Sequence, residues 1–222
     1  YLDPSGKQSE AAEGGKIEWL VKNGFTVLSP DLIGVGEMGP GAFKGDSYIK
    51  DVSYNVWFAA MLVGRSIVGV RAGDVVRLTQ LLQRRENAQA IYALAKKEMA
   101  PVLLHAAAFD SSINSVALIE PYTSYRSIVM HRFYNPAFIH STVPNALTAY
   151  DLPDLAAGLA PRKLLIVHAA DGAGNEPAPE EGEEDFAIIK TAYRHKNAGE
   201  QLRIIPGKPG SKNVDVYLDW IK

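Results

Sequence analysis

Residues 90–110 read AIYALAKKEMAPVLLHAAAFD, and this stretch decides the fold. It begins with a short apolar run, residues 90–94, which is typical of a buried strand. A tight polar break at residues 95–98 follows the run. An apolar helix is then predicted to reach about Phe109, with Pro101 in its first turn, where the missing N–H is not needed. The stretch therefore predicts a strand, a sharp turn and a helix that packs back on the sheet.

Other short apolar runs alternate with helical patterns along the chain. Each run is continuously apolar, which is typical of parallel strands that are buried on both faces. We therefore expect an α/β fold with a mainly parallel sheet and helices on both faces. The expected strands are residues 25–29, 90–94, 116–120, 164–168 and 202–205. The expected helices outside the opening stretch are residues 9–23, 52–85, 185–197 and 214–222, and residues 169–184 are expected to form a mobile loop.

The amino-acid composition limits the classes of protein to which the chain can belong. The 222 residues suit one domain, here residues 1–222, and 22% of them are charged, with a net charge of −2. This balance gives no electrostatic reason to expect a nucleic acid or an anionic membrane as partner. No apolar run approaches the roughly 20 residues that a membrane-spanning helix needs. The chain has no cysteine, which excludes disulfides and thiolate metal sites.

No cofactor or metal site is predicted. The glycine-rich turn at residues 30–37 has neither G-x-G-x-x-G nor P-loop spacing. His131, His140 and His195 lack the spacing of metal ligands. His105 falls on the helix after the sharp turn and is expected to be a packed core residue. Ser66, although flanked by glycines, follows no strand and is expected to make a helix contact.

Several local strings resemble the α/β-hydrolase superfamily, and among its members they are most similar to the acetyl xylan esterase-like hydrolases. The strings are VLSPDLIGVGE from Val27, GRSIVGVRAGDV from Gly64, LLHAAAFD from Leu103 and YDLPDLAAGLAPRKLLIVHAADGAG from Tyr150. The resemblance implies the α/β-hydrolase fold, a carbohydrate ester substrate and a secreted or periplasmic location. It begins after the first strands of that fold, so the domain is expected to be partial at its N-terminus and to contact an upstream domain of the same protein.

The resemblance also assigns the catalytic positions. The family places a nucleophilic serine in a Gly-x-Ser-x-Gly turn between strand and helix, and the serine position here is Lys97. The acid position is Asp171. The histidine is expected in residues 206–212, which contain none. The two oxyanion N–H groups would come from Glu98 and from the loop at Asp3, and the Glu98 side chain would disfavour a developing anion. Two of the three catalytic side chains are thus missing, which indicates a degenerate triad.

Other residues could complete a site at the same edge of the sheet. His168 ends a predicted strand where open parallel sheets bind ligands, and Tyr122 and Tyr125 follow another strand, so all three are candidate pocket residues. Lys97 could act as a Schiff-base or general-base lysine if it were desolvated. Alternatively, Lys97 fills a vacated site in solvent, near Asp171 but not in tight contact with it.

Three functions follow from these residues. The first is a catalytically degenerate hydrolase domain with a structural or docking role in a larger protein. The second is an active carboxylic ester hydrolase on acetylated polysaccharide, with catalytic residues supplied elsewhere. The third is a non-catalytic sugar-binding module that uses the old pocket and its aromatic rings.

Overall fold

A parallel sheet of four strands forms the centre of the molecule. The computed structural model describes residues 1–39, 48–49, 52–207 and 220. The strands are β3 (Ile91–Lys96), β4 (Ile113–Ile119), β5 (Lys163–Val167) and β6 (Leu202–Ile205), which pair in the order β3-β4-β5-β6. All three ladders are parallel. The predicted α/β class is confirmed.

The strand predicted at residues 25–29 is wrong. These residues are assigned no regular structure, although Leu28 accepts a hydrogen bond from the Tyr1 amino group at 2.9 Å. The neighbour of β3 on this side is Leu2, which makes a single parallel bridge to Ala95. No strand continues from Leu2 alongside residues 25–29. These residues therefore lack the ladder of hydrogen bonds that defines a strand.

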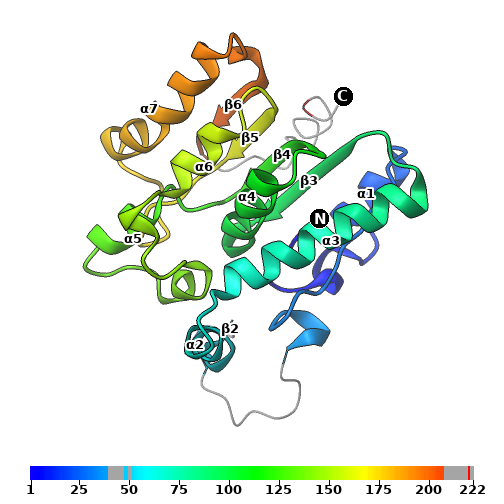
Figure 1. Cartoon of the computed structure of the whole chain (residues 1–222), viewed down its shortest axis with the longest axis horizontal. Helices are drawn as coiled ribbons and strands as arrows, with labels where there is room; N and C mark the ends of the chain where they lie inside the picture. Colours follow the sequence, from blue (N-terminus) through cyan, green and yellow to red (C-terminus); the bar gives the residue numbers. More distant parts are fainter. Residues whose placement is uncertain (40–47, 50–51, 208–219, 221–222) are drawn as a thin grey trace.

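Four helices cover one face of the sheet. They are α3 (Ile67–Glu86), α4 (Ala100–Phe109), α6 (Leu152–Gly158) and α7 (Pro179–His195), and Figure 1 shows them in front of the strands. Val116 and Leu118 of β4 belong to the core beneath these helices. Alternate residues, such as Ala117 and Ile119, pack on the opposite face. The sheet is therefore buried on both sides, as its continuous apolar runs predict.

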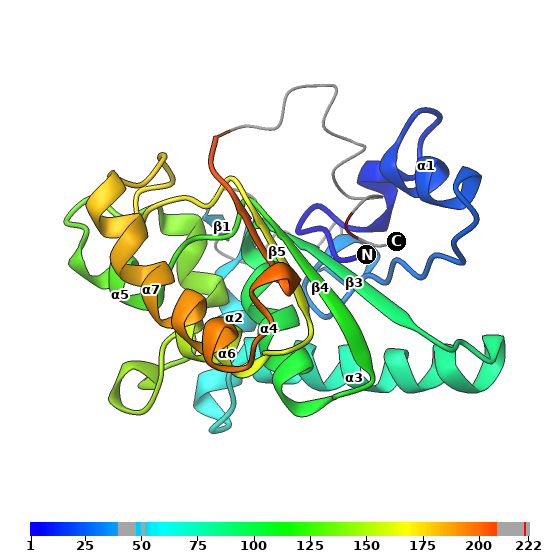
Figure 2. The same cartoon turned by 90° about the horizontal axis from the view of Figure 1, so that it is seen from above.

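The opposite face carries α1 (Lys16–Lys22), which Figure 2 shows across the sheet from α3. Leu20 and Trp220 are buried in the hydrophobic cluster on this face, which is smaller than the cluster beneath the four helices. The predicted helix at residues 9–23 is interrupted: the short helix η1 (Lys7–Glu10) precedes α1, and Gly15 is the N-cap of α1. The prediction of helices on both faces is confirmed. The predicted helix at residues 214–222 lies outside the described residues except for Trp220.

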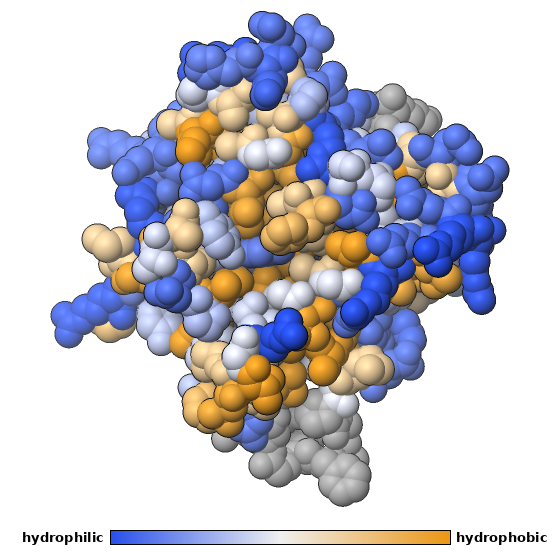
Figure 3. Space-filling view, viewed as in Figure 1, coloured by the Kyte–Doolittle hydropathy of each residue, from blue (hydrophilic) through white to orange (hydrophobic). Residues whose placement is uncertain are grey.

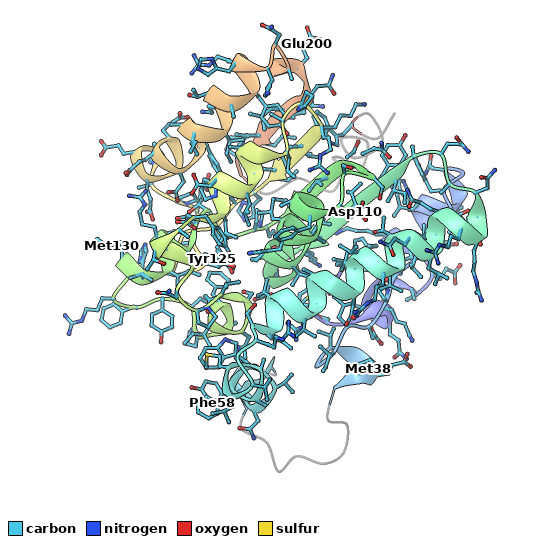
Figure 4. The ribbon with its side chains drawn as sticks, in the orientation of Figure 1. Met38, Phe58, Asp110, Tyr125, Met130 and Glu200 are labelled. Atoms are coloured by element: carbon cyan, nitrogen blue, oxygen red, sulfur yellow. The ribbon has the colours of Figure 1, made fainter. Side chains whose placement is uncertain are left out.

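A helix at the edge of the molecule leaves apolar side chains in solvent. The predicted helix at residues 52–85 consists of two helices, α2 (Tyr54–Leu62) and α3, bent by 93°. Ser66 is the N-cap of α3, where its side chain accepts a hydrogen bond from the N–H of Gly69 at 2.9 Å. Phe58 and Leu62 are 45% and 74% exposed; Figure 3 shows hydrophobic residues at the surface over α2, and Figure 4 labels Phe58 on this helix.

Within the described part of the chain, no single helix is long and apolar enough to cross a membrane. The bent pair formed by α2 and α3 together meets that test of length and composition.

Short elements complete the description. They are the strands β1 (Tyr48–Ile49) and β2 (Val52–Ser53), the helix α5 (Tyr125–Met130), and the 3₁₀ helices η2 (Gly36–Met38), η3 (Lys97–Met99), η4 (Pro136–Ser141), η5 (Ala146–Thr148) and η6 (Gly199–Gln201).

Helix α7 begins at Pro179, six residues before the predicted start, so the loop expected at residues 169–184 is shorter. Proline in the first turn and acidic residues near the helix N-terminus both favour this earlier start. Contacts with α5 hold the added turns: Glu181 accepts a hydrogen bond from Ser127 at 2.7 Å, and Arg126 donates to Glu184 at 2.8 Å.

Arg162 ties the C-terminal end of α4 to the start of β4. Its guanidinium donates to the carbonyls of Ala107, Asp110 and Ile113 at 2.6, 3.1 and 3.0 Å. Asp110, labelled in Figure 4, caps the end of α4. The last carbonyls of a helix lack intrahelical donors, so a cation here supplies hydrogen bonds and complements the helix dipole.

Replacing Arg162 with methionine is expected to lower the free energy of unfolding by about 2–4 kcal/mol, because three carbonyls lose a charged donor. Urea denaturation followed by circular dichroism measures this loss. Arg65→Met, at an exposed arginine, serves as the control and should change the value by less than about 0.5 kcal/mol. Equal effects of the two variants would contradict the assigned role.

Candidate functional site

Lys97 occupies the sharp turn between β3 and α4. The strand reaches Lys96, two residues beyond its predicted end, and the short helix η3 leads into α4. Lys97 has φ 49°, in the left-handed region that non-glycine residues rarely adopt. Such a conformation costs on the order of 1 kcal/mol and persists where the surrounding structure imposes it. The backbone geometry of a strained strand-to-helix turn is thus present, with lysine at its centre.

Two more side chains lie level with Lys97 at the same edge of the sheet. In the strand register Lys96 pairs with Ile119, and Ile119 pairs with Val167. The residues that directly follow these three are therefore Lys97, Glu120 and His168, on neighbouring strands about 4.8 Å apart. Glu120 and His168 also have left-handed backbones, with φ 53° and 50°. The three strands deliver an amine, a carboxylate and an imidazole to one row.

The charged groups of this row form one ion pair. The Nζ of Lys97 lies 3.7 Å from Oε2 of Glu120, and the two side chains are 47% and 35% exposed. A pair so accessible to water contributes about 0–1 kcal/mol to stability. His168 differs, because its Nδ1 is buried and has no hydrogen-bond partner among the described residues.

Asp171 makes its contacts away from this ion pair. Its Oδ1 accepts the N–H groups of Ala173 and Asn175, both at 2.8 Å, within its own loop. Its Oδ2 lies 3.5 Å from Nε2 of His131, just beyond α5. The sequence predicts that Asp171 lies near Lys97 without a tight contact. Among the described residues, the ion-pair partner of Lys97 is Glu120 and that of Asp171 is His131. Sequence reasoning missed His131.

A carboxyl group stands next to the position expected for an oxyanion. Burial is the main cause of the raised pKa of Glu98, and the charges of Asp3 and Glu120 raise it further. The N–H of Glu98 itself and the charge of Lys97 act in the opposite direction. When ionised, the Glu98 side chain would place a negative charge close to the N–H that an oxyanion would need.

Asp3 is the second residue expected at the oxyanion position. It is buried, its Oδ1 accepts the N–H of Ser5 at 2.9 Å, and its Oδ2 accepts the hydroxyl of Tyr1 at 3.1 Å. Lys96 lies 3.8 Å from the same Oδ2. Asp3 thus joins the N-terminal residues to the end of β3.

Tyr122 and Tyr125 are packed in the core. They are 2% and 3% exposed, and both hydroxyls donate to the carbonyl of Ser141, at 2.8 and 3.3 Å. Burial raises the pKa of both phenols. Tyr125 starts α5 and is labelled in Figure 4. Neither ring offers an exposed face to a sugar in this structure.

Three further expectations concern His105, the loop at residues 206–212 and metal binding. His105 is 6% exposed and hydrogen bonded to the carbonyl of Pro101 and the hydroxyl of Tyr150, at 2.6 and 2.8 Å, which confirms a core role. Of the loop expected to carry a histidine, only Pro206 and Gly207 lie within the described residues. The described part of the chain contains no group of three or more metal-ligating side chains.

Comparisons with known proteins identify the fold. No protein-family model matches the sequence, and no curated protein matches it. A Bacteroides fragilis NCTC 9343 structure, of a protein assigned as an acetyl xylan esterase, superposes with a TM-score of 0.64 at 17% identity over 85% of this chain and 48% of that one. The esterase Pf2001 of Pyrococcus furiosus superposes with a TM-score of 0.57 at 16% identity over 98% of this chain and 77% of that one.

The chain spans about half the length of the Bacteroides protein. At such low identity the likeness concerns the fold, because one fold hosts many chemistries.

Glu98 supplies a test of the site's electrostatics. Its folded pKa is raised above its unfolded value, so its ionisation costs stability as the pH rises through the folded pKa. Glu98→Gln is therefore expected to raise the free energy of unfolding at pH 7 and to have less effect at pH 4. Urea denaturation at the two pH values measures this, with Glu13→Gln, at an exposed glutamate, as control. A decrease at pH 7 would contradict the assignment.

The four-stranded parallel sheet, the strained turn into α4 and the structural matches together lead to one conclusion: the chain has the α/β-hydrolase fold of known esterases.

Proposed function

We propose that this chain is an α/β-hydrolase-fold domain without serine-esterase activity, which serves a structural or docking role in a larger protein. The observation that carries the proposal is the ion pair of Lys97 with Glu120 at the turn where an esterase of this fold needs its nucleophile. A lysine becomes a nucleophile when it is desolvated. Lys97 is 47% exposed and is held near a carboxylate that attracts its ammonium charge, so its environment opposes that activation.

The oxyanion position supports the same proposal. Acyl transfer needs N–H donors aimed at a developing negative charge. Here the residue at that position carries a carboxyl side chain, and Asp3 and Glu120 add negative charge near it, which the charge of Lys97 opposes. The three carboxyl groups disfavour a developing anion at the point where an esterase stabilises one.

One contact favours a second candidate, an active ester hydrolase acting on acetylated polysaccharide. Asp171 and His131 lie 3.5 Å apart, and a carboxylate beside an imidazole is how catalytic triads orient their base. This reading requires a nucleophile supplied from elsewhere. The third function, a sugar-binding module, would require surfaces other than the buried rings of Tyr122 and Tyr125.

Ester hydrolysis tests whether this chain on its own is catalytic. The chain, Lys97→Ala, Lys97→Ser and the control Lys196→Ala, at an exposed lysine, are assayed for acetate release from a p-nitrophenyl ester and from acetylated xylan. We expect no turnover above the uncatalysed rate from any of them, because Lys97→Ser restores neither a histidine nor the oxyanion site. Turnover by the unmodified chain that Lys97→Ala abolishes and Lys196→Ala retains would overturn the proposal and make Lys97 catalytic.

The docking role is argued from the open edge of β3. Leu2 donates to the carbonyl of Leu94 at 2.8 Å and accepts from the N–H of Lys96 at 3.0 Å. Alternate residues of a strand point their N–H and C=O groups to the same side. The N–H of Leu94 and the carbonyl of Tyr92 therefore point to the side of β3 on which Leu2 lies, where no described residue bonds them. A cavity of about 260 Å³ opens there. Its lining includes Tyr1, Leu20, Phe25, Val27, Leu82, Ile91 and Leu94.

Residues 1 and 2 lie between β3 and Leu28, and Tyr1 lines this cavity. Residues 1 and 2 bond β3 on one side, while the Tyr1 amino group bonds Leu28 on the other. Burial lowers the pKa of that amino group to about 6. A peptide N–H at the same place would keep the bond to Leu28 without burying a charge. An extended segment seated between β3 and Leu28 would satisfy the open edge of β3.

Two extensions before Tyr1 test the docking role. Val-Thr-Val should pair with β3, so the amide of Leu94 should exchange with deuterium more slowly than in the chain itself. Gly-Ser-Gly, the control, should leave this exchange fast. Both should remove the loss of about 2–3 kcal/mol of unfolding free energy expected between pH 8 and pH 6, since the folded pKa of the amine lies below its unfolded value of 8.0. Equal Leu94 exchange in both extended chains would refute the docking role.

A further inference from the structure

Arg71 is a buried cation without a carboxylate partner. It is 4% exposed on the inner face of α3, and no described acidic side chain lies within ion-pair distance of it. Its Nε donates to the carbonyl of Ile33 at 3.0 Å. Burial lowers the pKa of Arg71 to about 10, so the guanidinium stays charged at neutral pH. An unpaired buried charge is costly, and proteins keep such charges paired or bound to a ligand.

Two further polar groups in the same region lack partners. His140 of η4 is 2% exposed, and neither of its ring nitrogens makes a hydrogen bond among the described residues. The indole Nε1 of Trp57 in α2 is also buried, and no residue that the structure describes bonds it. The His140 ring lies edge-on to the rings of Tyr54 and Trp57, with centroids 5.9 and 6.4 Å away.

The charge of Arg71 affects the pKa of His140. Burial is the main cause of the lowered pKa of His140, and the charge of Arg71 lowers it further. The carbonyl of Ala137 acts in the opposite direction, although it is not placed for a hydrogen bond. His140 is therefore neutral at pH 7, and the cluster of Arg71, His140 and Trp57 carries one positive charge.

The backbone of the neighbouring loop leaves room for the guanidinium. A Cβ on Gly34 would lie 3.1 Å from Nη2 of Arg71 and 3.3 Å from the side chain of Val56. Gly34 also has φ 77°, a conformation that favours glycine. The loop thus approaches Arg71 closely from one side, while Ile33 fixes Nε and leaves the other guanidinium nitrogens for a further acceptor.

The cluster lies beside the strained turn. Helix η4, which carries His140, packs against both α3 and η3, and η3 begins with Lys97. Tyr122 also reaches this region, since its hydroxyl donates to the carbonyl of Ser141. Arg71 of α3 and His140 of η4 therefore lie on elements that neighbour each other, and η4 also neighbours the turn that begins with Lys97.

We infer that Arg71, His140 and Trp57 form a subsite for one carboxylate group of a small ligand. A carboxylate can accept two parallel hydrogen bonds from the guanidinium fork and further ones from the indole and imidazole N–H groups. It also matches the single positive charge of the cluster, whereas a phosphate dianion would leave a net negative charge buried. This inference goes beyond the proposed function, because binding at the subsite needs no hydrolysis.

Access to the cluster is supplied by α2. This helix has no fully buried residue, and the bend between α2 and α3 contains Gly64 in a left-handed conformation with φ 70°. Val56, Trp57 and Ala60 of α2 pack against the core as partly buried side chains, so opening of α2 costs less free energy than opening of a fully buried helix. Movement of α2 at this bend would uncover Trp57 and, behind it, Arg71.

Titration calorimetry with acetate and glucuronate tests the subsite, with glucose and inorganic phosphate as controls. We expect saturable binding of acetate and glucuronate and no binding of glucose or phosphate. Glucuronate should bind more tightly than acetate only if the ligand of the subsite is a sugar acid. Trp57→Phe keeps the ring and loses the N–H, so it should weaken binding about five- to tenfold. Arg71→Lys keeps the charge and loses the fork, so it should weaken binding more than tenfold.

Arg77→Lys, on the exposed side of α3, is the matched control and should bind as the unmodified chain does. Circular dichroism establishes that each variant is folded. The inference is wrong if neither carboxylate binds at tens of millimolar, if glucose binds equally well, or if Arg77→Lys weakens binding as much as Arg71→Lys. These outcomes are independent of the ester-hydrolysis assay, so failure here leaves the proposed function standing.

Discussion

The register of the parallel ladder is the constraint on which the rest of the structure depends. Lys96, Ile119 and Val167 are cross-strand partners, so the residues after them leave the sheet at one level. The left-handed backbone at each of these exits turns the chain sharply away from the strand direction. Lys97 and Glu120 can meet because the hydrogen bonds of the sheet have already fixed their positions. The chemistry at this edge is thus chosen by side chains, while its geometry is set by the backbone.

Much of the fold could be predicted from local sequence patterns. Continuous apolar runs identify the four strands, and the run ending at Leu94, followed by a polar break and Pro101, identifies the strained turn. The run at residues 25–29 failed because an apolar segment becomes a strand only when a neighbour pairs with it. The early start of α7 was missed because contacts with α5, more than fifty residues away, stabilise its first turns.

The candidate site was harder to predict, because its contacts join distant parts of the chain. The position of Lys97 follows from local spacing, but its partner Glu120 depends on strand register. His131 and Asp171 are forty residues apart, and no periodicity links them. Arg71 did carry a signal: it lies four residues from Ile67 and from Val75, both buried, so the helical spacing placed a cation on the buried stripe of α3. Apolar patterning alone passes over such a residue.

The open edge of β3 also bears on how copies of this chain behave together. An unpaired strand edge beside apolar side chains is a template for pairing with another molecule. The neighbouring segment, residues 25–29, carries no charged side chain to discourage such pairing. In a concentrated solution the β3 edges of two copies would pair, and the sheet would continue from one molecule into the next. The net charge of −2 offers little repulsion to keep copies apart, so this edge favours association of the chain at high concentration.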